Sequence, residues 1–333
     1  MCLESWKVGI SKNYSKIKEP KGFFFHTMNY ICKNEVVIIN KIINFAAIGG
    51  DLRQIQVINS IAKMGHQVSV CGFEKCKENF FLPPVKPCDC VSRCFENAEI
   101  VILPLPYTTN GITVNAPFCD EDLVIENVIT TLKTGQKLFV GKVDEKIKQL
   151  CETYSVDCVD YFDREELTIA NAIPTVEGAI MIAMRETPFT LHGSNCLCLG
   201  FGRIGKILSK MLAGIGANVS VAARKPSDFA WINAYDYTSL NIGKLEDEIG
   251  KFDIIFNTVP RLVLDFNLLS KMKKDVLVID LASRPGGTAF DVAKQLGINA
   301  KHELSLPGRV APQTAGKIIA NTILNIIESQ ERS

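Results

Sequence analysis

The segment NCLCLGFGRIG, residues 195–205, decides the fold of this 333-residue chain. Its first five residues suit a buried strand, and Ile207, Leu208 and Leu212 follow it at the spacing of one helix face. The glycines between strand and helix match the G-x-G-x-x-G pattern. A strand before that pattern and a helix after it are the setting in which it binds a dinucleotide. The segment therefore predicts a Rossmann-type, dinucleotide-binding domain.

Each glycine of the pattern has its own physical role. Gly200 makes the tight turn, Gly202 lets the backbone approach the pyrophosphate, and Gly205 lets the helix pack closely on the strand. The helix N-terminus then presents free N–H groups and the positive end of its dipole to the phosphates. We place Arg203 and Ile204, which lie inside the pattern, in the same cofactor site.

The end of the next expected strand, residues 218–222, indicates which dinucleotide binds. Sites that prefer NAD usually carry Asp or Glu there to hold the ribose 2′-OH. This chain instead has Arg224 and Lys225, with Ser227 just beyond. Because an arginine can stack on adenine and pair with a 2′-phosphate, we predict NADP, with NAD as the alternative cofactor. The alternative role of the two cations is that of a solvated basic pair on a loop.

Two later strand ends complete the expected site. Ligands of open α/β sheets bind at the carboxyl ends of the strands. The loops after the expected strands 253–256 and 276–279 should therefore lie near the nicotinamide. Arg284 is placed there as a group that pairs with carboxylates. The predicted cofactor contacts of these two loops are Thr258, Val259, Pro260 and Ala282.

The composition excludes several other functions. With 37 basic and 36 acidic residues, the net charge is +1, which is too small for a general attraction to nucleic-acid phosphates. The longest apolar stretch, Val36 to Ile48, is interrupted by Asn40, Lys41 and Asn44, well short of the roughly 20 residues of a membrane span. We expect neither nucleic acid nor a membrane as a partner.

The 12 cysteines are the unusual feature of the composition. Five of them gather between Cys71 and Cys94, but no C-x-x-C pair occurs among them, and the nearest histidine is His66. We therefore expect no metal site. The thiols are interpreted as small apolar side chains in a reducing compartment.

Short apolar strands alternate with helices along most of the chain, which indicates parallel sheets covered on both faces. A helix over residues 175–186, starting after Pro174, separates two such series. The predicted class is α/β, with two Rossmann-like doubly wound parallel-sheet domains and a cleft between them. The expected strands are 45–48, 67–71, 100–105 and 137–140, then 195–199, 218–222, 253–256, 276–279 and 298–301.

The domain boundaries follow from the same patterns. Residues 1–42 lack periodicity and are expected to be a poorly ordered extension. Residues 43–172 and 173–305 form the two domains. An amphipathic helix is expected at residues 313–329.

Five motifs, in this order along residues 43–328, resemble the A subunits of dipicolinate synthase, a family related to alanine and 2-hydroxyacid dehydrogenases. The resemblance implies that residues 43–172 are the substrate-side domain and that the terminal helix packs back on it. The motifs are IGGDLRQ (48–54), PTVEGA (174–179), LGFGR (199–203), DLASRPGG (280–287) and LPGRVAP (306–312).

The resemblance also implies a reaction and a setting. The reaction is the NADP-dependent oxidation of dihydrodipicolinate to dipicolinate, pyridine-2,6-dicarboxylate, during sporulation. A small dicarboxylate is then the substrate, and a separate flavoprotein-like B subunit is the partner. The implied location is the cytoplasm of the mother cell of a sporulating bacterium. Whether the chain also forms a homo-oligomer stays open.

Oxidising such a substrate requires docking of two carboxylates and acceptance of a proton. For docking we name Arg53, in the first turn of the helix after Gly49-Gly50-Asp51, and Arg284 across the expected cleft. Thr108 and Thr109 would add hydroxyl donors.

Glu177 and Asp51 are the two candidates for the proton acceptor. Each has a simpler alternative role at a helix start, Glu177 as a capping-box partner and Asp51 as an N-cap.

Two alternative functions also remain. One is a dehydrogenase for another small amino or hydroxy acid, although no His–carboxylate pair stands at a predicted strand end to polarise a ketone. The other is a non-catalytic, NADPH-binding regulatory subunit whose partner carries out the chemistry.

Overall fold

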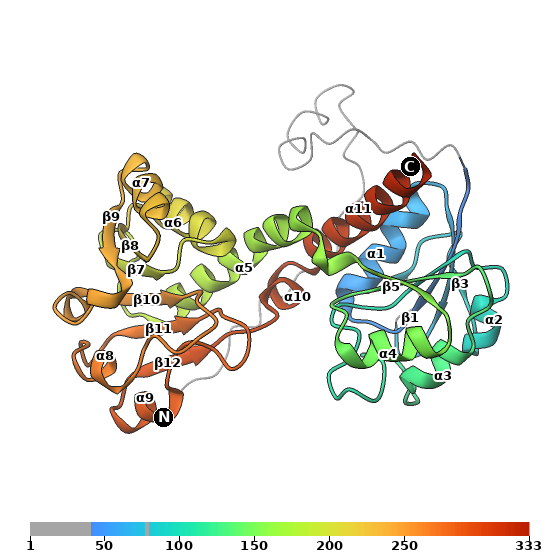
Figure 1. Ribbon diagram of the computed structural model, residues 1–333, viewed down its shortest axis with the longest axis horizontal. Coiled ribbons are helices and arrows are strands. Elements are labelled where there is room, and N and C mark those ends of the chain that lie inside the picture. Colours follow the sequence, from blue (N-terminus) through green and yellow to red (C-terminus); the bar gives the residue numbers. More distant parts are fainter. Residues whose placement is uncertain (1–40, 77–79, 333) are drawn as a thin grey trace, which may run out of the picture. The chain divides into compact units, whose positions relative to one another are not determined.

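The computed structural model describes residues 41–76 and 80–332 (Figure 1). Apart from its last two residues, the expected N-terminal extension, residues 1–42, lies outside the described residues. The described chain contains two six-stranded sheets in which all neighbouring strands run parallel. This confirms the predicted class of two Rossmann-like α/β domains.

The first sheet has the strand order β3-β2-β1-β4-β5-β6. Helices α1 and α11 cover one of its faces, and α2, α3 and α4 cover the other. Its strands are β1 (Asn44–Ile48), β2 (Gln67–Cys71), β3 (Lys86–Pro87), β4 (Ile100–Ile102), β5 (Lys137–Val140) and β6 (Asp157–Asp160). The helices are α1 (Leu52–Lys63), α2 (Val91–Phe95), α3 (Ile125–Thr130), α4 (Glu145–Thr153) and the 3₁₀ turn η2 (Tyr161–Asp163).

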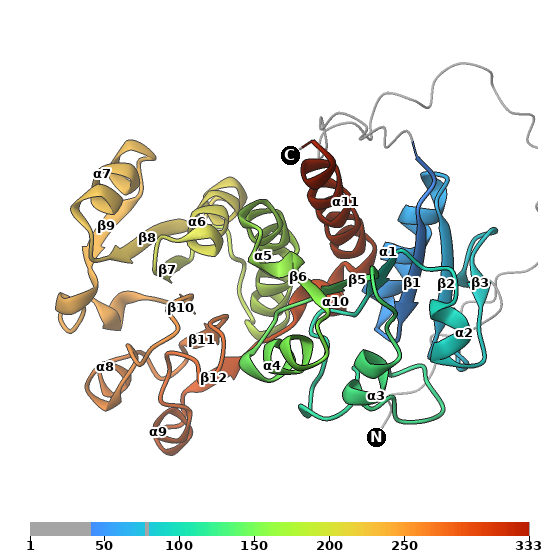
Figure 2. The same ribbon diagram turned by 45° about the vertical axis from the view of Figure 1, so that its right-hand side comes forward.

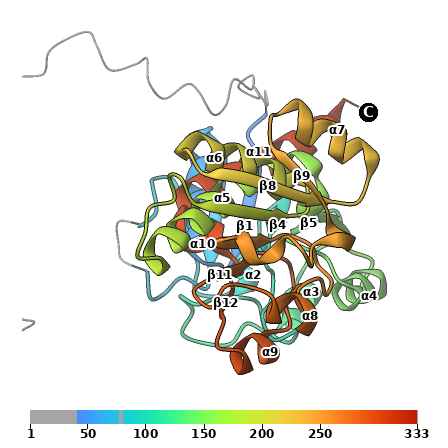
Figure 3. The same ribbon diagram turned by 90° about the vertical axis from the view of Figure 1, so that its left-hand side faces the viewer.

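The second sheet has the order β12-β11-β10-β7-β8-β9, and Figure 3 shows β8 and β9 above β11 and β12. Helices α5, α6 and α7 cover one face, and α8 and α9 cover the other. Its strands are β7 (Asn195–Leu199), β8 (Asn218–Ala223), β9 (Thr238–Asn241), β10 (Ile254–Asn257), β11 (Leu277–Asp280) and β12 (Asn299–His302). The helices are α6 (Arg203–Ile215), α7 (Pro226–Ala234), α8 (Phe266–Ser270), α9 (Phe290–Gln295), and the turns η3 (Ile242–Lys244) and η4 (Ile249–Lys251).

Three strands that the sequence pattern did not predict lie at the edges of the sheets. Strands β3, β6 and β9 have no fully buried residue, so their sequences lack the apolar run that marks a central parallel strand. The central strands β7 and β10, by contrast, are buried on both faces along almost their whole length. Burial on both faces is therefore what made the central strands recognisable.

Helix α5 (Glu165–Glu186) corrects one expectation. It begins ten residues before the predicted start at Thr175 and carries Pro174 inside it. Proline has no N–H for the helical ladder, but here the side chains on both sides of it, Leu167 and Val176 among them, are buried and hold the helix together. By length and composition α5 could cross a membrane, but half of its most apolar stretch is buried inside the protein, as in a core helix.

The terminal helix α11 (Pro312–Glu331) packs along α1, as Figure 2 shows, and follows the short helix α10 (Leu306–Val310). The contact is close because Gly316 has no side chain: a Cβ there would lie 2.5 Å from both Arg53 O and Gln56 Cβ. Ile319, Ile323 and other apolar residues of α11 join the same buried cluster as Phe45 of β1. Helix α11 thus belongs to the core of the first domain.

Truncation of Ile323 tests that assignment. Ile323→Ala should lower the free energy of unfolding by about 2–5 kcal/mol, because it removes most of a fully buried side chain from a packed core. Ile169→Ala is the matched control, because Ile169 on α5 is 45% exposed. It should change the free energy of unfolding by no more than about 0.5 kcal/mol. Urea unfolding followed by circular dichroism measures both, and equal losses would contradict the packing of α11.

Candidate functional site

The turn between β7 and α6 has the geometry of a dinucleotide loop. Gly200 adopts φ +93°, and a Cβ there would lie 2.6 Å from Thr258 Oγ1. A Cβ at Gly205 would lie 2.1 Å from the carbonyl oxygen of Gly200. Since real Cβ atoms do not approach other atoms so closely, both positions require glycine, one for the turn and one for the contact between helix and strand.

Gly202 differs from its two neighbours in the pattern. Its φ is −81°, and a Cβ built on it would meet no atom within 4 Å. It is the N-cap of α6, and no side chain accepts a hydrogen bond from the N–H groups of the first turn. The space beside Gly202 and these free N–H groups fit a phosphate, which a helix N-terminus favours through its N–H groups and dipole.

The other two residues of the pattern have contacts within the protein. Arg203 donates from Nη1 to Glu165 Oε2 at 2.9 Å and to Thr168 Oγ1 at 2.8 Å, so its guanidinium is directed to α5. Ile204 is half-buried and packs against the apolar cluster under α6. Their backbone N–H groups therefore remain their means of contacting a phosphate.

Two cations follow β8, the neighbour of β7. Arg224 and Lys225 are exposed, and neither side chain forms a hydrogen bond or an ion pair with any residue in 41–76 or 80–332. Lys225 precedes α7 as its N-cap, with Pro226 at the first helical position. An unpaired guanidinium and ammonium at this strand end suit an anionic group on the ribose of a dinucleotide.

The loop after β10 is fastened to β7. Thr258 donates from Oγ1 to the carbonyl oxygen of Leu199 at 2.8 Å. The buried Asn257 side chain donates to Val259 O and accepts from Val259 N, both at 3.1 Å. Pro260 is exposed beyond them. These contacts place Thr258 and Val259 beside Gly200, at the carboxyl edge of the sheet, and Pro260 follows them in the loop.

A buried carboxylate organises the loop after β11. Asp280 is completely buried and accepts hydrogen bonds from Ala282 N at 3.0 Å, Gly287 N at 2.8 Å and Thr288 Oγ1 at 2.7 Å. Ala282 is itself buried, whereas Arg284 is exposed and its side chain has no partner among the described residues. Asp280 thus shapes the backbone that presents Arg284.

His302, at the end of β12, supports the same loop and was not predicted. Its Nε2 lies 2.8 Å from the carbonyl oxygen of Ala282, and its ring stacks on Phe290 with centroids 5.2 Å apart. The sequence offered one signal for His302 and Asp280: each is a polar residue directly after a predicted strand (298–301 and 276–279), and each ends the observed strand.

In the first domain, Asp51 and Arg53 form an ion pair at the start of α1. Arg53 Nη2 lies 2.7 Å from Asp51 Oδ2, and Arg53 Nε bonds both carboxylate oxygens at 3.0 and 3.1 Å. Asp51 also caps α1 by accepting from Arg53 N at 2.9 Å. The Arg53 side chain is 8% exposed and lies against Gly308, where a Cβ would be 2.8 Å from Arg53 Nε. Its charge is therefore balanced by Asp51.

The two predicted threonines lie in different settings. Thr108 donates from Oγ1 to Thr113 O at 2.7 Å and accepts from Gly111 N at 3.0 Å, so its hydroxyl holds a local turn. Thr109 is exposed and its hydroxyl has no partner among the described residues. Of the pair, Thr109 is the one whose hydroxyl remains available to a ligand.

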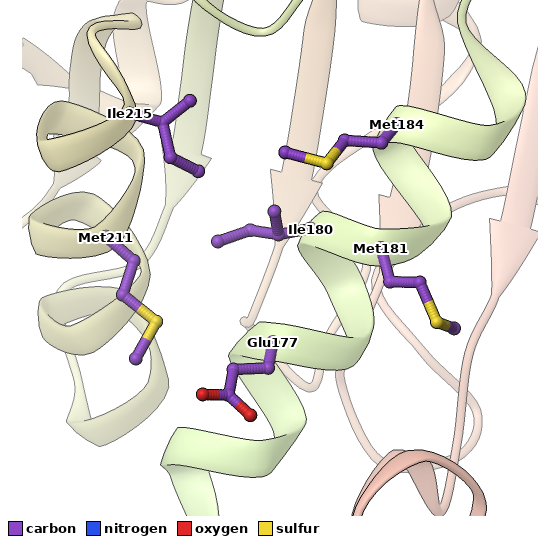
Figure 4. Close-up of a pocket in the computed structure, with 6 residues that line it drawn as sticks. All are labelled: Glu177, Ile180, Met181, Met184, Met211 and Ile215. Carbon is purple, nitrogen blue, oxygen red and sulfur yellow. The ribbon is translucent and has the colours of Figure 1, made fainter. Parts of the chain in front are cut away.

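Glu177 lies apart from these strand ends. Figure 4 shows its carboxylate in an apolar groove between α5 and α6, whose lining includes Ile180, Met184 and Met211. Met211 is eight residues along α6 from Arg203, or about 12 Å from the phosphate-binding end at 1.5 Å per residue. The structure does not bring Glu177 together with the glycine loop. Its position inside α5 also removes the helix-start role, because the helix begins at Glu165.

Of the five cysteines between residues 71 and 94, Cys71 and Cys94 are buried, Cys76 and Cys88 are half-buried, and Cys90 is exposed. Burial raises the pKa of Cys71 to about 12 and raises that of Cys94 as well. No group of three side chains suited to a metal ion occurs within residues 41–76 and 80–332. His66 accepts from Ile43 N at 3.3 Å, and burial lowers its pKa. These groups pack the first domain and lie outside the site described above.

Each of the two domains matches a known protein family. Residues 44–162 match the N-terminal domain of the A subunit of dipicolinate synthase, and residues 176–293 match the NAD-binding domain of D-isomer specific 2-hydroxyacid dehydrogenases. The dipicolinate synthase A subunit of Bacillus subtilis (strain 168) is 34% identical over 286 residues, which cover 86% of this chain and 96% of that protein.

Solved structures agree with these matches. The crystal structure of the dipicolinate synthase A subunit from Bacillus halodurans has a TM-score of 0.80 and 32% identity, covering 86% of this chain and 97% of that one. An L-alanine dehydrogenase has a TM-score of 0.61 at 14% identity, covering 84% of this chain and 88% of that one. The second likeness concerns the fold alone.

The different surroundings of two glycines allow binding and folding to be separated. Gly202→Ala should weaken dinucleotide binding about tenfold or more, because its methyl group would occupy the space left for a phosphate. It should change the free energy of unfolding by at most about 1 kcal/mol, since the methyl group meets no protein atom. Calorimetric titration and urea unfolding measure the two effects.

Gly205→Ala is the matched variant in the same loop. It should lower the free energy of unfolding by about 1–3 kcal/mol, because the new Cβ collides with the Gly200 carbonyl. Unchanged cofactor affinity in Gly202→Ala would show that the phosphates do not bind at this loop.

Proposed function

The chain belongs to the family of dipicolinate synthase A subunits, and we propose that it oxidises dihydrodipicolinate to dipicolinate with NADP as the hydride acceptor. The match with the Bacillus subtilis protein over nearly its whole length is the observation that carries this proposal. That the chain is an NAD(P)-dependent oxidoreductase is shown by the same relative together with the NAD-binding domain of residues 176–293. This confirms the enzyme class expected from the sequence.

The choice of NADP over NAD rests on the strand end after β8. Arg224 and Lys225 are exposed there without a carboxylate partner among the described residues. The 2′-phosphate of NADP carries the negative charge that such a pair stabilises, and the 2′-OH of NAD does not. The phosphates between the two nucleosides would bind at Gly200, Gly202 and the first turn of α6.

The reaction converts a dihydropyridine ring into an aromatic pyridine by removing a hydride and a proton. When bound, the nicotinamide ring accepts the hydride. The chain's own residues then have two tasks, to hold the substrate carboxylates and to take up the proton. Arg284 is suited to the first task, because it is an exposed arginine without an acidic partner in the described part of the chain. Thr109 adds an available hydroxyl.

Asp51 is the group that we assign to proton uptake. Its carboxylate is 32% exposed at the carboxyl end of β1, where ligands bind in such sheets. Arg53, which was predicted to dock the substrate, instead holds the Asp51 carboxylate through three hydrogen bonds. We therefore propose Arg53 as a positioning residue for Asp51. Glu177 has no part in this mechanism because it lies in the groove between α5 and α6.

The proposal includes a partner and a setting. A separate flavoprotein-like B subunit would work with this chain, in the cytoplasm of the mother cell of a sporulating bacterium. The support for both is family membership, which rests on the match over 86% of the chain. The substrate is accordingly a small dicarboxylate.

Reversing the charge after β8 tests the cofactor. Arg224→Asp should weaken NADP binding by tenfold or more, about 1.4 kcal/mol, and should strengthen NAD binding, since a carboxylate can accept from the ribose 2′-OH. Lys210→Asp, an exposed position on α6, is the control for net charge and should leave the ratio of the two affinities unchanged. Fluorescence titration with each cofactor gives the ratio. Equal affinity of the parent protein for NADP and NAD would contradict the assignment.

Asp51→Asn tests the reaction and the proton acceptor together. The purified parent chain, supplied with NADP and with dihydrodipicolinate made in situ, should generate NADPH absorbance and dipicolinate. Asp51→Asn should reduce kcat by about 10²–10⁴-fold and leave the NADP affinity unchanged, because asparagine keeps the helix cap but cannot take up the proton.

Asp265→Asn is the matched control, because Asp265 caps α8 with similar backbone angles and accepts from Leu268 N. It should keep full activity. Turnover that appears only after the B subunit is added would favour the non-catalytic, regulatory alternative over the proposed function.

A further inference from the structure

The arginines of the chain divide into two groups. All ten lie within the described residues, and seven form ion pairs with carboxylates: Arg53, Arg93, Arg164, Arg185, Arg203, Arg309 and Arg332. The other three, Arg224, Arg261 and Arg284, are exposed, and their side chains form neither an ion pair nor a hydrogen bond with a described residue. These three follow β8, β10 and β11, at the edge of the sheet where ligands bind.

The strand order separates the three arginines into two sides. Strand β7, whose carboxyl end carries the phosphate-binding glycines, lies between β8 on one side and β10 and β11 on the other. In this fold the adenosine half of a bound dinucleotide would extend toward β8, where Arg224 would be positioned for a 2′-phosphate. The nicotinamide half extends the other way and carries no phosphate beyond those bound at β7. An anion paired with Arg261 or Arg284 would therefore belong to the substrate and not to the cofactor.

The loops that carry Arg261 and Arg284 are fastened to each other. Gly287 O accepts hydrogen bonds from Val263 N and Leu264 N, both at 2.9 Å. A Cβ at Gly287 would lie 2.8 Å from the carbonyl oxygen of Arg261, so the two backbones are in close contact there. Gly287 N is held in turn by the buried Asp280 carboxylate at 2.8 Å. Arg261 and Arg284 are thus each within three residues of the contact between Gly287 and residues 263–264, which Asp280 anchors.

We propose that Arg261 and Arg284 bind the two carboxylates of the substrate, one guanidinium to each, and that Arg261 thereby selects dicarboxylates over monocarboxylates. The inference rests on the proposed function, which supplies the dicarboxylate. In pyridine-2,6-dicarboxylate the two carboxylates lie on either side of the ring nitrogen, so two cations on adjacent loops match their arrangement. Arginine suits this task because its planar fork can bond both oxygens of a carboxylate.

The experiment compares two ligands that differ by one carboxylate. Pyridine-2,6-dicarboxylate and pyridine-2-carboxylate are titrated calorimetrically into the full chain in the presence of NADPH. The parent protein should bind the dicarboxylate about tenfold to hundredfold more tightly, as expected for one additional charge-assisted pair. Arg261→Gln should lose this difference and bind the two ligands alike, with its affinity for the monocarboxylate and for NADPH unchanged. Arg261→Lys should recover part of the difference, since it restores charge without the fork.

Arg185→Gln is the control, because Arg185 is an exposed arginine on α5 that is paired with Glu186, away from this edge. It should keep the full preference for the dicarboxylate. A preference that survives in Arg261→Gln would overturn the inference and leave the proposed function intact. Weaker NADPH binding by Arg261→Gln would also overturn it, by assigning Arg261 to the cofactor. Failure of the parent to bind the dicarboxylate at all would overturn the proposed substrate and this inference together.

Discussion

Only a hydrogen atom fits on the Cα of Gly205, because a Cβ there would lie 2.1 Å from the Gly200 carbonyl oxygen. That contact brings α6 onto the end of β7 and sets the direction of its first turn. The free N–H groups of the turn then open beside Gly202, and Thr258 locks the neighbouring loop by donating to Leu199 O at 2.8 Å. Strand β10 pairs with β7, and β11 pairs with β10, so the loop that Asp280 organises lies at the same edge of the sheet. A single close approach of backbone to backbone therefore determines where an anion can bind.

The central strands could be predicted from the sequence because strands buried on both faces consist of short runs of apolar residues. Asn195–Leu199, Gln67–Cys71 and Lys137–Val140 were predicted with the bounds that the structure has. Of the four edge strands only β12 was predicted, at residues 298–301. A strand such as Thr238–Asn241 was missed because it has no fully buried residue and has the composition of a loop. The start of α5 was predicted wrongly, just after Pro174, for a related reason. The local rule that proline starts a helix is weaker than the packing of the apolar side chains that surround it in α5.

The candidate site shows the same division between local and long-range information. The turn at Gly200 depends on its own backbone angle, and the contact of Gly205 is with Gly200, five residues away, so the motif alone was sufficient to predict both roles. Whether the Arg53 guanidinium is free to bind a ligand depends on which carboxylate pairs with it. From the sequence, an arginine at a helix start next to a strand end suggested a ligand-binding role. The structure gives it a carboxylate two residues away and covers it with Gly308, more than 250 positions along the chain. His302 likewise acquires its role only when β11 and β12 lie side by side, whereas Asp280 bonds groups of its own loop, no more than eight residues away.

The near-zero net charge conceals an unequal distribution of charge between the two domains. At the carboxyl edge of the first sheet, the Arg53 charge is balanced by Asp51 at 2.7 Å. At the carboxyl edge of the second sheet, three guanidiniums have no acidic partner among the described residues. An exposed arginine gains little from a surface ion pair, so leaving three unpaired is not costly to folding. The Asp280 carboxylate also lies at this edge, but it is completely buried beneath its loop, whereas the three guanidiniums are exposed to solvent. The second domain thus carries the attraction for anionic ligands. The first domain presents the Asp51 carboxylate, whose orientation is fixed by three hydrogen bonds from Arg53.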